Sequence, residues 1–469
     1  MESQSEKTNT PGFITKNHIG KLRKIILFLL LFILTPEAYN QVQVRESPPS
    51  GYRTRIRNYI DTLRIVDTHE HLFNPDLLKQ STLLDFMLLF NMQNYYDFVS
   101  SGLPRNTFLT LVGDSLSISG KWDLIEPYWK GSGNTAYNRV SLIAADHLFG
   151  IDDINRTTIG PLSDKIRNAY KGNWFNYVAE EKCRFDFIIQ DGDRMGPEYK
   201  KIRYVSRYTP WITVRSKYRV DSISVMQVSE IKTLEDFVAS LEDKLIQDLK
   251  NKGIVGIKIN MAYSRSLNVE RVKTEAARKV FRSLMDNKEY EHMTWQTAKP
   301  LQDYMVIKLL ELADKHDLPV AIHTGIQTGN GNRLENSNPL LLANLFQDFP
   351  AVRFSLFHGS YPFGGELATL AKNYPNVYID MCWLYAIAPS YSERYLHEWL
   401  ETVPANKIMA FGGDYNNIEN VYGELVVAKQ IITRVLTDKV RERYMSEERA
   451  MAIAKMILHD NAVSFYKLR

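Results

Sequence analysis

Three histidine-bearing segments and one aspartate stand at the ends of predicted β-strands, and these residue types bind divalent metal ions. The segments are Val66-Asp67-Thr68-His69-Glu70-His71, Ala321-Ile322-His323, Leu356-Phe357-His358 and Phe411-Gly412-Gly413-Asp414. Residues two apart in a strand point to the same face, so His69 and His71 point together while Glu70 points away. Imidazole and carboxylate ligands suit zinc, and a catalytic zinc keeps one position open. The pattern predicts a metal centre where these strands converge.

Eight short β-rich runs, separated by helical stretches, must position these side chains. The runs are Arg64–His69, Phe185–Gln190, Val205–Ile212, Ile254–Ile259, Pro319–His323, Arg353–His358, Asn376–Met381 and Lys407–Phe411. Apolar strands that alternate with amphipathic helices are typical of a parallel sheet buried on both faces. Eight repeats favour closure of that sheet. We therefore predict the α/β class and a (β/α)8 TIM barrel that carries the metal residues at its carboxyl-end rim.

Two connections are too long for simple crossovers. The first spans about residues 73–182 and is rich in aromatic residues, and the second spans 261–318 with a helix expected over Glu275–Asn287. Insertions after strands one and four lie at the C-terminal face of a barrel, so we expect them to form a helical cap over the site. Most aromatic residues of the first insertion should fill the cap's own core, and a minority should line the substrate pocket.

The N-terminus has the composition of a secretory signal peptide. Basic residues between Lys16 and Lys24 precede the apolar run Ile25–Leu34 and a polar break. This run is too short for a hydrocarbon core of about 30 Å, which takes roughly 20 helical residues. We predict a signal peptide and polar lead over residues 1–45, followed by the catalytic barrel over 46–469, with 73–182 as its cap. We expect export to the periplasm without stable membrane insertion once the signal is removed.

The composition is that of an ordinary soluble enzyme. Hydrophobic residues make up 44% of the 469 residues, and 58 basic and 54 acidic residues leave a net charge of +4. The basic residues are scattered, which argues against nucleic acid as a partner. Cys183 and Cys382 are far apart, so we expect buried apolar thiols and no disulfide framework. A small molecule is the expected partner, and a homo-oligomer stays open.

These motifs resemble the amidohydrolase superfamily, in particular its amidohydrolase-related branch. That branch includes zinc decarboxylases and lactonases, and uronate isomerases are more distant relatives. The chain is most similar to the amidohydrolase-like domain that precedes a glutamine-synthetase-like domain in some fungal and plant proteins. The resemblance covers the chain from about residue 60 to the C-terminus. The segments that carry it are Gly256-Ile257-Lys258, Ala262-Tyr263, Val320 to Gly325, Asn338 to Leu341, His358 to Phe363 and Tyr374 to Asp380.

Matched by position, the resemblance implies four ligands for one zinc or other divalent ion. His69 and His71 match the first-strand ligands, and His323 and Asp414 match those of strands five and eight. His358 matches the sixth-strand histidine, which binds a second metal in binuclear members and assists catalysis in mononuclear members. We favour one ion per chain.

Three basic residues are further candidates. Lys258 falls where binuclear members carry a carbamylated lysine as a metal ligand, so a second ion requires that modification of Lys258. Relatives read Ala-Tyr-Arg-Ser-Gly-Leu where this chain reads Ala-Tyr-Ser-Arg-Ser-Leu, so Arg265 is displaced by one position. Lys258, Arg265 and Arg139 are nevertheless candidates for binding a substrate carboxylate.

The expected function is metal-dependent hydrolysis of an amide, ester or lactone bond in a small, carboxylated molecule. A divalent ion lowers the pKa of its bound water to about 7. Asp414 would act as general base on that water, and His358 would polarise the carbonyl. Non-oxidative decarboxylation and uronate-type isomerisation on the same metal site stay open as alternatives, as does a periplasmic metal- or ligand-binding protein.

Overall fold

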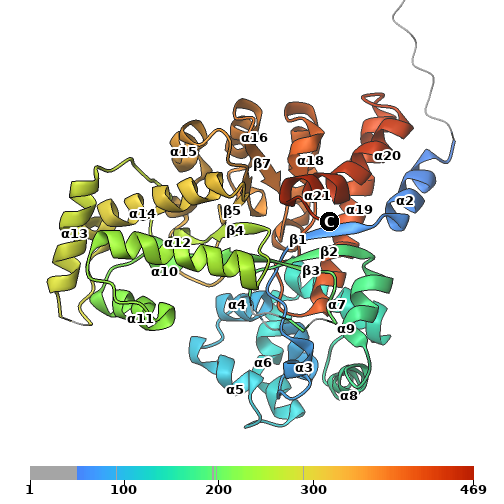
Figure 1. Ribbon diagram of the computed structural model, residues 1–469. Helices are drawn as coiled ribbons and strands as arrows, with labels where there is room; N and C mark the ends of the chain where they lie inside the picture. The colour runs from blue at the N-terminus through green and yellow to red at the C-terminus, as the bar shows by residue number, and fades with distance from the viewer. Residues whose placement is uncertain (1–49, 91, 193–194, 197, 289) are drawn as a thin grey trace, which may run out of the picture. The chain divides into compact units, whose positions relative to one another are not determined.

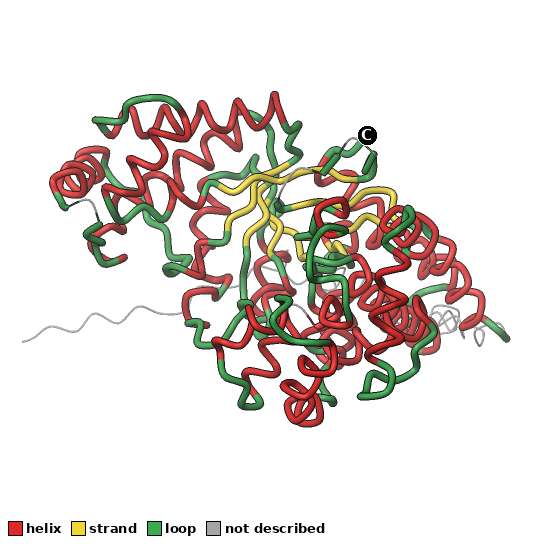
Figure 2. Tube along the Cα trace, turned by 90° about the horizontal axis from the view of Figure 1, so that it is seen from below, coloured by secondary structure: helices red, strands yellow, loops and turns green. Residues whose placement is uncertain are grey.

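The sheet of eight parallel strands confirms the predicted barrel. The computed structural model describes residues 50–469 except 91, 193–194, 197 and 289, so the expected signal peptide lies outside the described residues. Each strand pairs with the next one along the chain, and helices surround the strands (Figures 1 and 2). The strands are β1 (Ile65–Glu70), β2 (Phe185–Gln190), β3 (Ile202–Arg207), β4 (Gly256–Ile259), β5 (Val320–Ile322), β6 (Phe354–Leu356), β7 (Val377–Asp380) and β8 (Ile408–Met409).

Hydrogen bonds between β1 and the segment after β8 bring the two edges of the sheet together. The Thr68 N–H donates to the Phe411 carbonyl at 3.0 Å. The Asp414 N–H donates to the His69 carbonyl, also at 3.0 Å. The sheet is therefore a nearly closed, TIM-barrel-like ring, and the contacts that close it lie beside the predicted metal ligands.

The third strand ends earlier than its sequence suggests. The apolar run Val205–Ile212 predicted one strand, but β3 ends at Arg207 and α10 (Thr209–Ile212) follows. Pro210 explains the break, because proline has no N–H for a sheet ladder and fits the first turn of a helix. Arg207 consequently stands at a strand end, on the rim of the barrel.

The first insertion forms a helical cap between β1 and β2, as predicted. Its aromatic residues pack mostly on one another, since Phe86, Phe90, Phe98 and Trp122 are fully buried in a core separate from that of the barrel. The cap elements are α3 (Pro75–Leu78), η1 (Phe86–Phe90), α4 (Gln93–Ser100), η2 (Arg105–Thr107), α5 (Phe108–Val112), α6 (Ile118–Ser132), α7 (Ala136–Phe149), α8 (Ile159–Ala169), α9 (Trp174–Asn176) and η3 (Tyr177–Lys182).

The cap is held against the β8 loop and against α19 (Ile418–Arg441). The Gln93 side-chain amide donates to the Asp414 carbonyl at 2.8 Å. Helix α7 crosses α19 so closely that a Cβ on Gly423 would lie 2.4 Å from the Val140 carbonyl oxygen, which explains the glycine there. The cap is thus fixed to the loop that carries a predicted metal ligand.

The second insertion does not join this cap. The predicted helix Glu275–Asn287 is α13 (Thr274–Asp286), and Figure 1 shows it beside α11, α12 and α14, away from α4 to α8. Its apolar face includes Phe281, whose ring contacts that of Phe237 on α12 with centroids 5.6 Å apart. The helices after β3 and β4 are α11 (Lys217–Gln227), α12 (Leu234–Asn251), η4 (Met261–Tyr263), α13 and α14 (Trp295–Lys315).

The remaining helices complete the outer layer. They are α2 (Tyr52–Thr62), η5 (Leu334–Ser337), η6 (Pro339–Leu342), α15 (Ala343–Asp348), η7 (His358–Ser360), α16 (Gly364–Asn373), α17 (Leu384–Ile387), α18 (Pro389–Thr402), η8 (Ala405–Lys407), α20 (Glu447–Lys455), η9 (Met456–Asp460) and α21 (Asn461–Tyr466). Cys183 and Cys382 are buried free thiols, as expected. Between residues 50 and 469, leaving aside the gaps named above, no helix is long and apolar enough to cross a membrane.

Candidate metal centre

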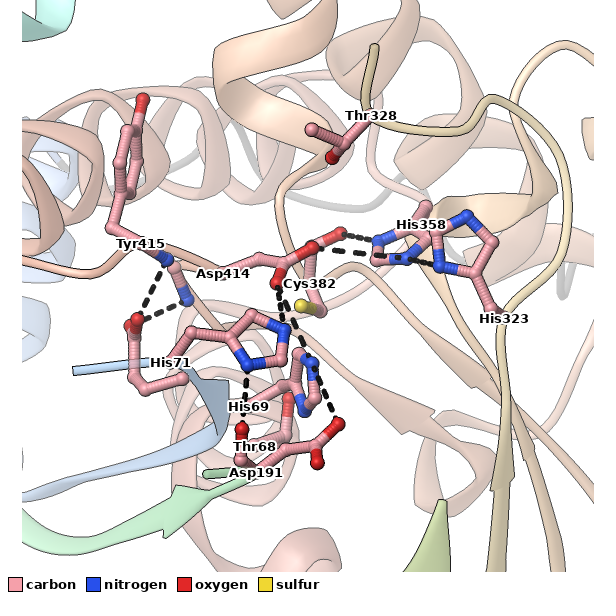
Figure 3. Close-up of polar contacts among 12 residues, drawn as sticks. Thr68, His69, His71, Asp191, His323, Thr328, His358, Cys382, Asp414 and Tyr415 are labelled. Atoms are coloured by element: carbon pink, nitrogen blue, oxygen red, sulfur yellow. Dashed lines mark hydrogen bonds and ion pairs between the residues drawn. The ribbon is translucent and has the colours of Figure 1, made fainter. Parts of the chain in front are cut away.

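His69, His71 and Asp414 converge at the carboxyl end of the barrel. Figure 3 shows both imidazoles turned toward the carboxylate, with His69 Nε2 at 3.4 Å and His71 Nε2 at 3.2 Å from Asp414 Oδ1. Bonds of 2.0–2.1 Å to a tetrahedral ion separate its ligand atoms by about 3.3 Å. Two imidazoles and one carboxylate at this spacing fit a zinc-like ion that keeps a further position open.

The surroundings of these three groups suit metal binding. His69 Nδ1 has no hydrogen-bond partner among the described residues, and burial lowers the pKa of His69 well below its ordinary value, so the ring is neutral. His71 Nδ1 contacts the Asp191 carbonyl at 2.6 Å, which leaves Nε2 for the ion. Burial alone would raise the pKa of Asp414, but the two histidines lower it well below the ordinary value. His69 is therefore offered as a neutral imidazole and Asp414 as an anionic carboxylate, the forms that bind metal. Burial alone would lower the pKa of His71, but the Asp414 carboxylate raises it, so a metal ion bound at His71 Nε2 would displace a proton.

Glu70 holds the loop that carries Asp414. Its side chain points away from the metal centre, as period-two alternation predicts, and accepts hydrogen bonds from the Gly413 N–H at 3.0 Å and the Tyr415 N–H at 2.8 Å. A Cβ on Gly413 would lie 2.3 Å from Glu70 Oε1, so a side chain there would break this contact. Asp414 itself has φ +58°, a left-handed conformation that aspartate tolerates better than most residues. The two hydrogen bonds stabilise that conformation.

We expect Glu70→Ala to destabilise the protein by about 2–6 kcal/mol, since two buried amides lose their acceptor at roughly 1–3 kcal/mol each. We also expect loss of turnover per folded molecule, because Asp414 is no longer held in place. Urea unfolding and kcat/KM measure the two effects. Glu419→Ala is the matched control, since this buried glutamate of α19 accepts a hydrogen bond from Trp174 Nε1 of α9 at 2.8 Å. Equal activity of the two folded variants would contradict the positioning role of Glu70.

His358 and His323 form a pair beside the three-residue group. His358 Nε2 lies 2.9 Å from His323 Nδ1, and 3.9 Å from Asp414 Oδ2. The outer nitrogens contact backbone carbonyls, those of Cys382 at 3.1 Å and Ile326 at 2.9 Å. Both nitrogens of His323 are thus engaged, so a metal ion would have to displace one of its partners. The structure places His323 with His358 instead of among the three converging donors.

Lys258 points into the same site from β4. It is 1% exposed, and its ammonium has no hydrogen-bond acceptor in the described part of the chain. Its Nζ lies 3.5 Å from the centre of the Phe357 ring. Burial lowers the pKa of Lys258 to about 8, although Asp414 and Asp191 favour the charged form. An amine that loses its proton this readily has the chemistry that carbamylation requires.

The two predicted substrate arginines lie away from the metal centre. Arg265 is buried and bound to Asp303 at 2.5 Å, so its charge is neutralised inside the protein and is not available to a substrate. Arg139 lies on the exposed face of α7, where it reaches Gln430 at 3.5 Å. Neither arginine is therefore among the residues that converge at the metal centre, and their roles in substrate binding stay predictions.

The sequence reasoning missed Asp191 and Arg207 at the ends of β2 and β3. Asp191 Oδ2 accepts from Arg207 Nε at 2.7 Å and lies 3.9 Å from His69 Nε2. Arg207 Nη2 lies 3.2 Å from His71 Nε2, and its side chain is 36% exposed. The sequence could have indicated Asp191, because it directly follows the predicted strand Phe185–Gln190. Arg207 was concealed inside a run that was expected to continue to Ile212.

Cys382 is a second missed residue of the site. Its Sγ belongs to a further group of donors with His358 and Asp414, all within 4.8 Å of one another. Burial raises the pKa of the Cys382 thiol well above its ordinary value, which keeps it protonated and a weaker ligand than a neutral imidazole. Nothing in its sequence context distinguished it from a buried apolar cysteine.

The barrel and its buried histidine–aspartate group define the class of protein, a TIM-barrel-like fold of the metal-dependent hydrolase and isomerase kind. The chain belongs to the amidohydrolase family, whose model matches residues 233–468, half of the chain. It is also 27% identical over 250 residues to Protein fluG of Emericella nidulans. That match covers 51% of this chain and 29% of the fungal protein, so the chain spans less than a third of that relative.

Two solved structures share the fold over almost their whole length. Uronate isomerase of Thermotoga maritima matches with a TM-score of 0.72 at 14% identity, over 88% of this chain and 97% of its own. Glucuronate isomerase of Caulobacter crescentus matches with a TM-score of 0.71 at 16% identity, over 91% and 96%. At these identities the similarity establishes the shared fold.

Proposed function

We propose that this chain is a metal-dependent hydrolase that cleaves an amide, ester or lactone bond in a small, carboxylated molecule. The observation that carries the proposal is the convergence of the His69 and His71 imidazoles on Asp414, which is distant from both in sequence, at 3.2–3.4 Å. A divalent ion held by these residues would supply Lewis-acid chemistry, lowering the pKa of bound water and polarising a carbonyl.

The chain's own residues provide the proton transfers and the binding of charge. Asp414 is the general base, because its low pKa and its place beside His71 keep it ionised at neutral pH. His358 Nε2 faces the same carboxylate, while Nδ1 donates to the Cys382 carbonyl. Nε2 therefore donates to the substrate oxygen in the imidazolium form of His358, which the negative charge gained by that oxygen stabilises. Arg207, held by Asp191 with part of its guanidinium exposed, binds a substrate carboxylate.

Elemental analysis and a substrate panel test this proposal. Purified full-length chain should contain about one zinc or other divalent ion, lose its turnover after treatment with a chelator, and regain it when zinc is added back. The panel should contain N-acyl amino acids, aryl esters and lactones, each followed by release of a carboxylic acid. Turnover that survives complete removal of metal would exclude this function.

Isomerisation of a uronate is the second candidate. It is favoured by the match to two isomerases over nearly their entire length, and by a guanidinium at the rim that suits a sugar carboxylate. Proton NMR of glucuronate and galacturonate incubated with the zinc-loaded chain distinguishes the two candidates. Conversion of an aldose to a ketose without acid release would replace the hydrolase proposal.

A further inference from the structure

A large cavity lies between the cap and the β5 loop. Its volume is about 880 Å³, toward the upper end of the roughly 300–1,000 Å³ of small-molecule sites. Its lining is mostly apolar, with residues from α4, η2, α5 and the loops after β1, β5 and β8. A cavity of this size has room for more of a substrate than the groups around the bond that is cleaved.

The floor of this cavity belongs to the loops that carry the metal-site residues. Phe73 follows His71 by two residues, and its N–H donates to the Asn416 carbonyl at 2.9 Å. Asn416 in turn follows Asp414 by two residues. On the β5 loop, Gly329 lines the cavity next to Thr328, which Figure 3 shows above Asp414. The cavity and the metal centre therefore share three loops, those after β1, β5 and β8.

The wall on the cap side is aromatic and held in place. The Tyr95 ring contacts Tyr96 and Phe108, with centroids 5.6 and 5.0 Å apart. The Tyr95 hydroxyl donates to the Arg105 carbonyl at 2.7 Å, which leaves its ring as an apolar surface. Across the cavity, Asn330 Nδ2 donates to Ser100 Oγ at 2.9 Å and ties the β5 loop to α4. Such a wall suits a flat or branched apolar group.

The charged lining of the cavity is positive. Arg105 is the only charged residue among the described residues that line it, and its side chain is exposed. Its Nη2 lies 3.8 Å from the Cβ position of Gly331, which places the guanidinium beside the β5 loop. An apolar cavity with a single cation and no acidic lining residue matches an apolar anion.

We propose that this cavity binds the arm of an elongated substrate: an apolar, preferably aromatic chain with an anionic end at Arg105 and its scissile carbonyl at the metal centre. This inference rests on the proposed function, since it assigns a substrate class to the same site. It also separates the two candidates there, because a uronate is polar along its whole length and gains little from an aromatic wall.

Two fluorescent probes that differ only in charge test the binding site. The probes are 1-anilinonaphthalene-8-sulfonate and its neutral analogue N-phenyl-1-naphthylamine, titrated into zinc-loaded full-length chain. We expect Arg105→Gln to weaken binding of the sulfonate about fivefold and to leave the neutral probe unchanged. Tyr96→Ala should weaken binding of both probes about tenfold, because it removes an aromatic wall.

Two surface variants serve as controls for misfolding of the chain and for binding of the probe outside the cavity. Leu109 lines the cavity and Val225 lies on α11, and both side chains are 79% exposed, so a charge at either position leaves the fold intact. Leu109→Glu should weaken binding of the sulfonate at least about fivefold, whereas Val225→Glu should not change it. Sulfonate affinities that are equal in Leu109→Glu, Arg105→Gln and the unmodified chain would overturn the inference.

Failure of this inference and failure of the proposed function give different results. Asp414→Asn should bind both probes as the unmodified chain does, since Asp414 does not line the cavity. Normal turnover in Asp414→Asn would remove the hydrolase mechanism and leave the probe data standing. Loss of turnover in Asp414→Asn with unaltered probe affinities in Leu109→Glu would instead keep the hydrolase and remove the assigned substrate class.

Discussion

Asp414→Asn is expected to lower kcat/KM by about 10³- to 10⁴-fold, because it removes the general base and one negative ligand from a site whose other two ligands are imidazoles. The substitution is conservative in shape. Asparagine tolerates the left-handed backbone at φ +58° as aspartate does, and the hydrogen bonds of its flanking amides to Glu70 are unaffected. We therefore expect near-normal thermal stability and a reduced metal content, measured by calorimetry and elemental analysis.

Asp317→Asn is the control for this variant. Asp317 also has a left-handed backbone, at φ +52°, but its exposed carboxylate pairs with Arg353 at 2.9 Å on the outside of the barrel. Its replacement should change kcat/KM by less than about twofold, as expected for an exposed ion pair. If Asp414→Asn retained the activity of the unmodified chain, Asp414 would not be the base.

His358→Asn is expected to lower kcat by about 10²- to 10³-fold while the zinc stays bound. The loss is that of one donor to a developing oxyanion, about 3–4 kcal/mol. Metal is retained because the three converging ligand atoms belong to other residues, and His358 lies 3.9 Å from the carboxylate. Stopped-flow or steady-state assays measure the loss, and the zinc content per chain shows whether the metal is kept.

The metal count in this variant also tests the number of ions. His358 forms a second donor group with Cys382 and Asp414, so a chain that held two ions would lose one of them on substitution. His397→Asn is the control, since His397 lies on α18, where its nearest carboxylate is that of Asp438 at 3.9 Å. A fall from two ions to one would refute the single-ion centre, and full activity would refute the role of His358.

Local patterns in the sequence determined the elements of this protein and the residues at their ends. Period-two alternation alone points His69, in β1, and His71, directly after β1, to one side and Glu70 to the other, and the structure has this arrangement. Apolar runs located all eight strands, because a strand buried on both faces leaves a continuous apolar signature. The strand-end position of Asp414 then followed from barrel topology.

Tertiary structure decided which of those side chains meet and which are already engaged. His323 ends a strand as expected, but its two nitrogens contact His358 and a backbone carbonyl. Arg265 carries a charge that could bind a substrate carboxylate, but Asp303 neutralises that charge in the interior of the protein. His358 and Asp303 lie 35 and 38 residues from the side chains that they contact, so their identity depends on how the strands and helices pack, and no local pattern records it. The physical reason is that spacing sets the direction of a side chain, whereas contacts between distant segments set its partners, its charge and its access to substrate.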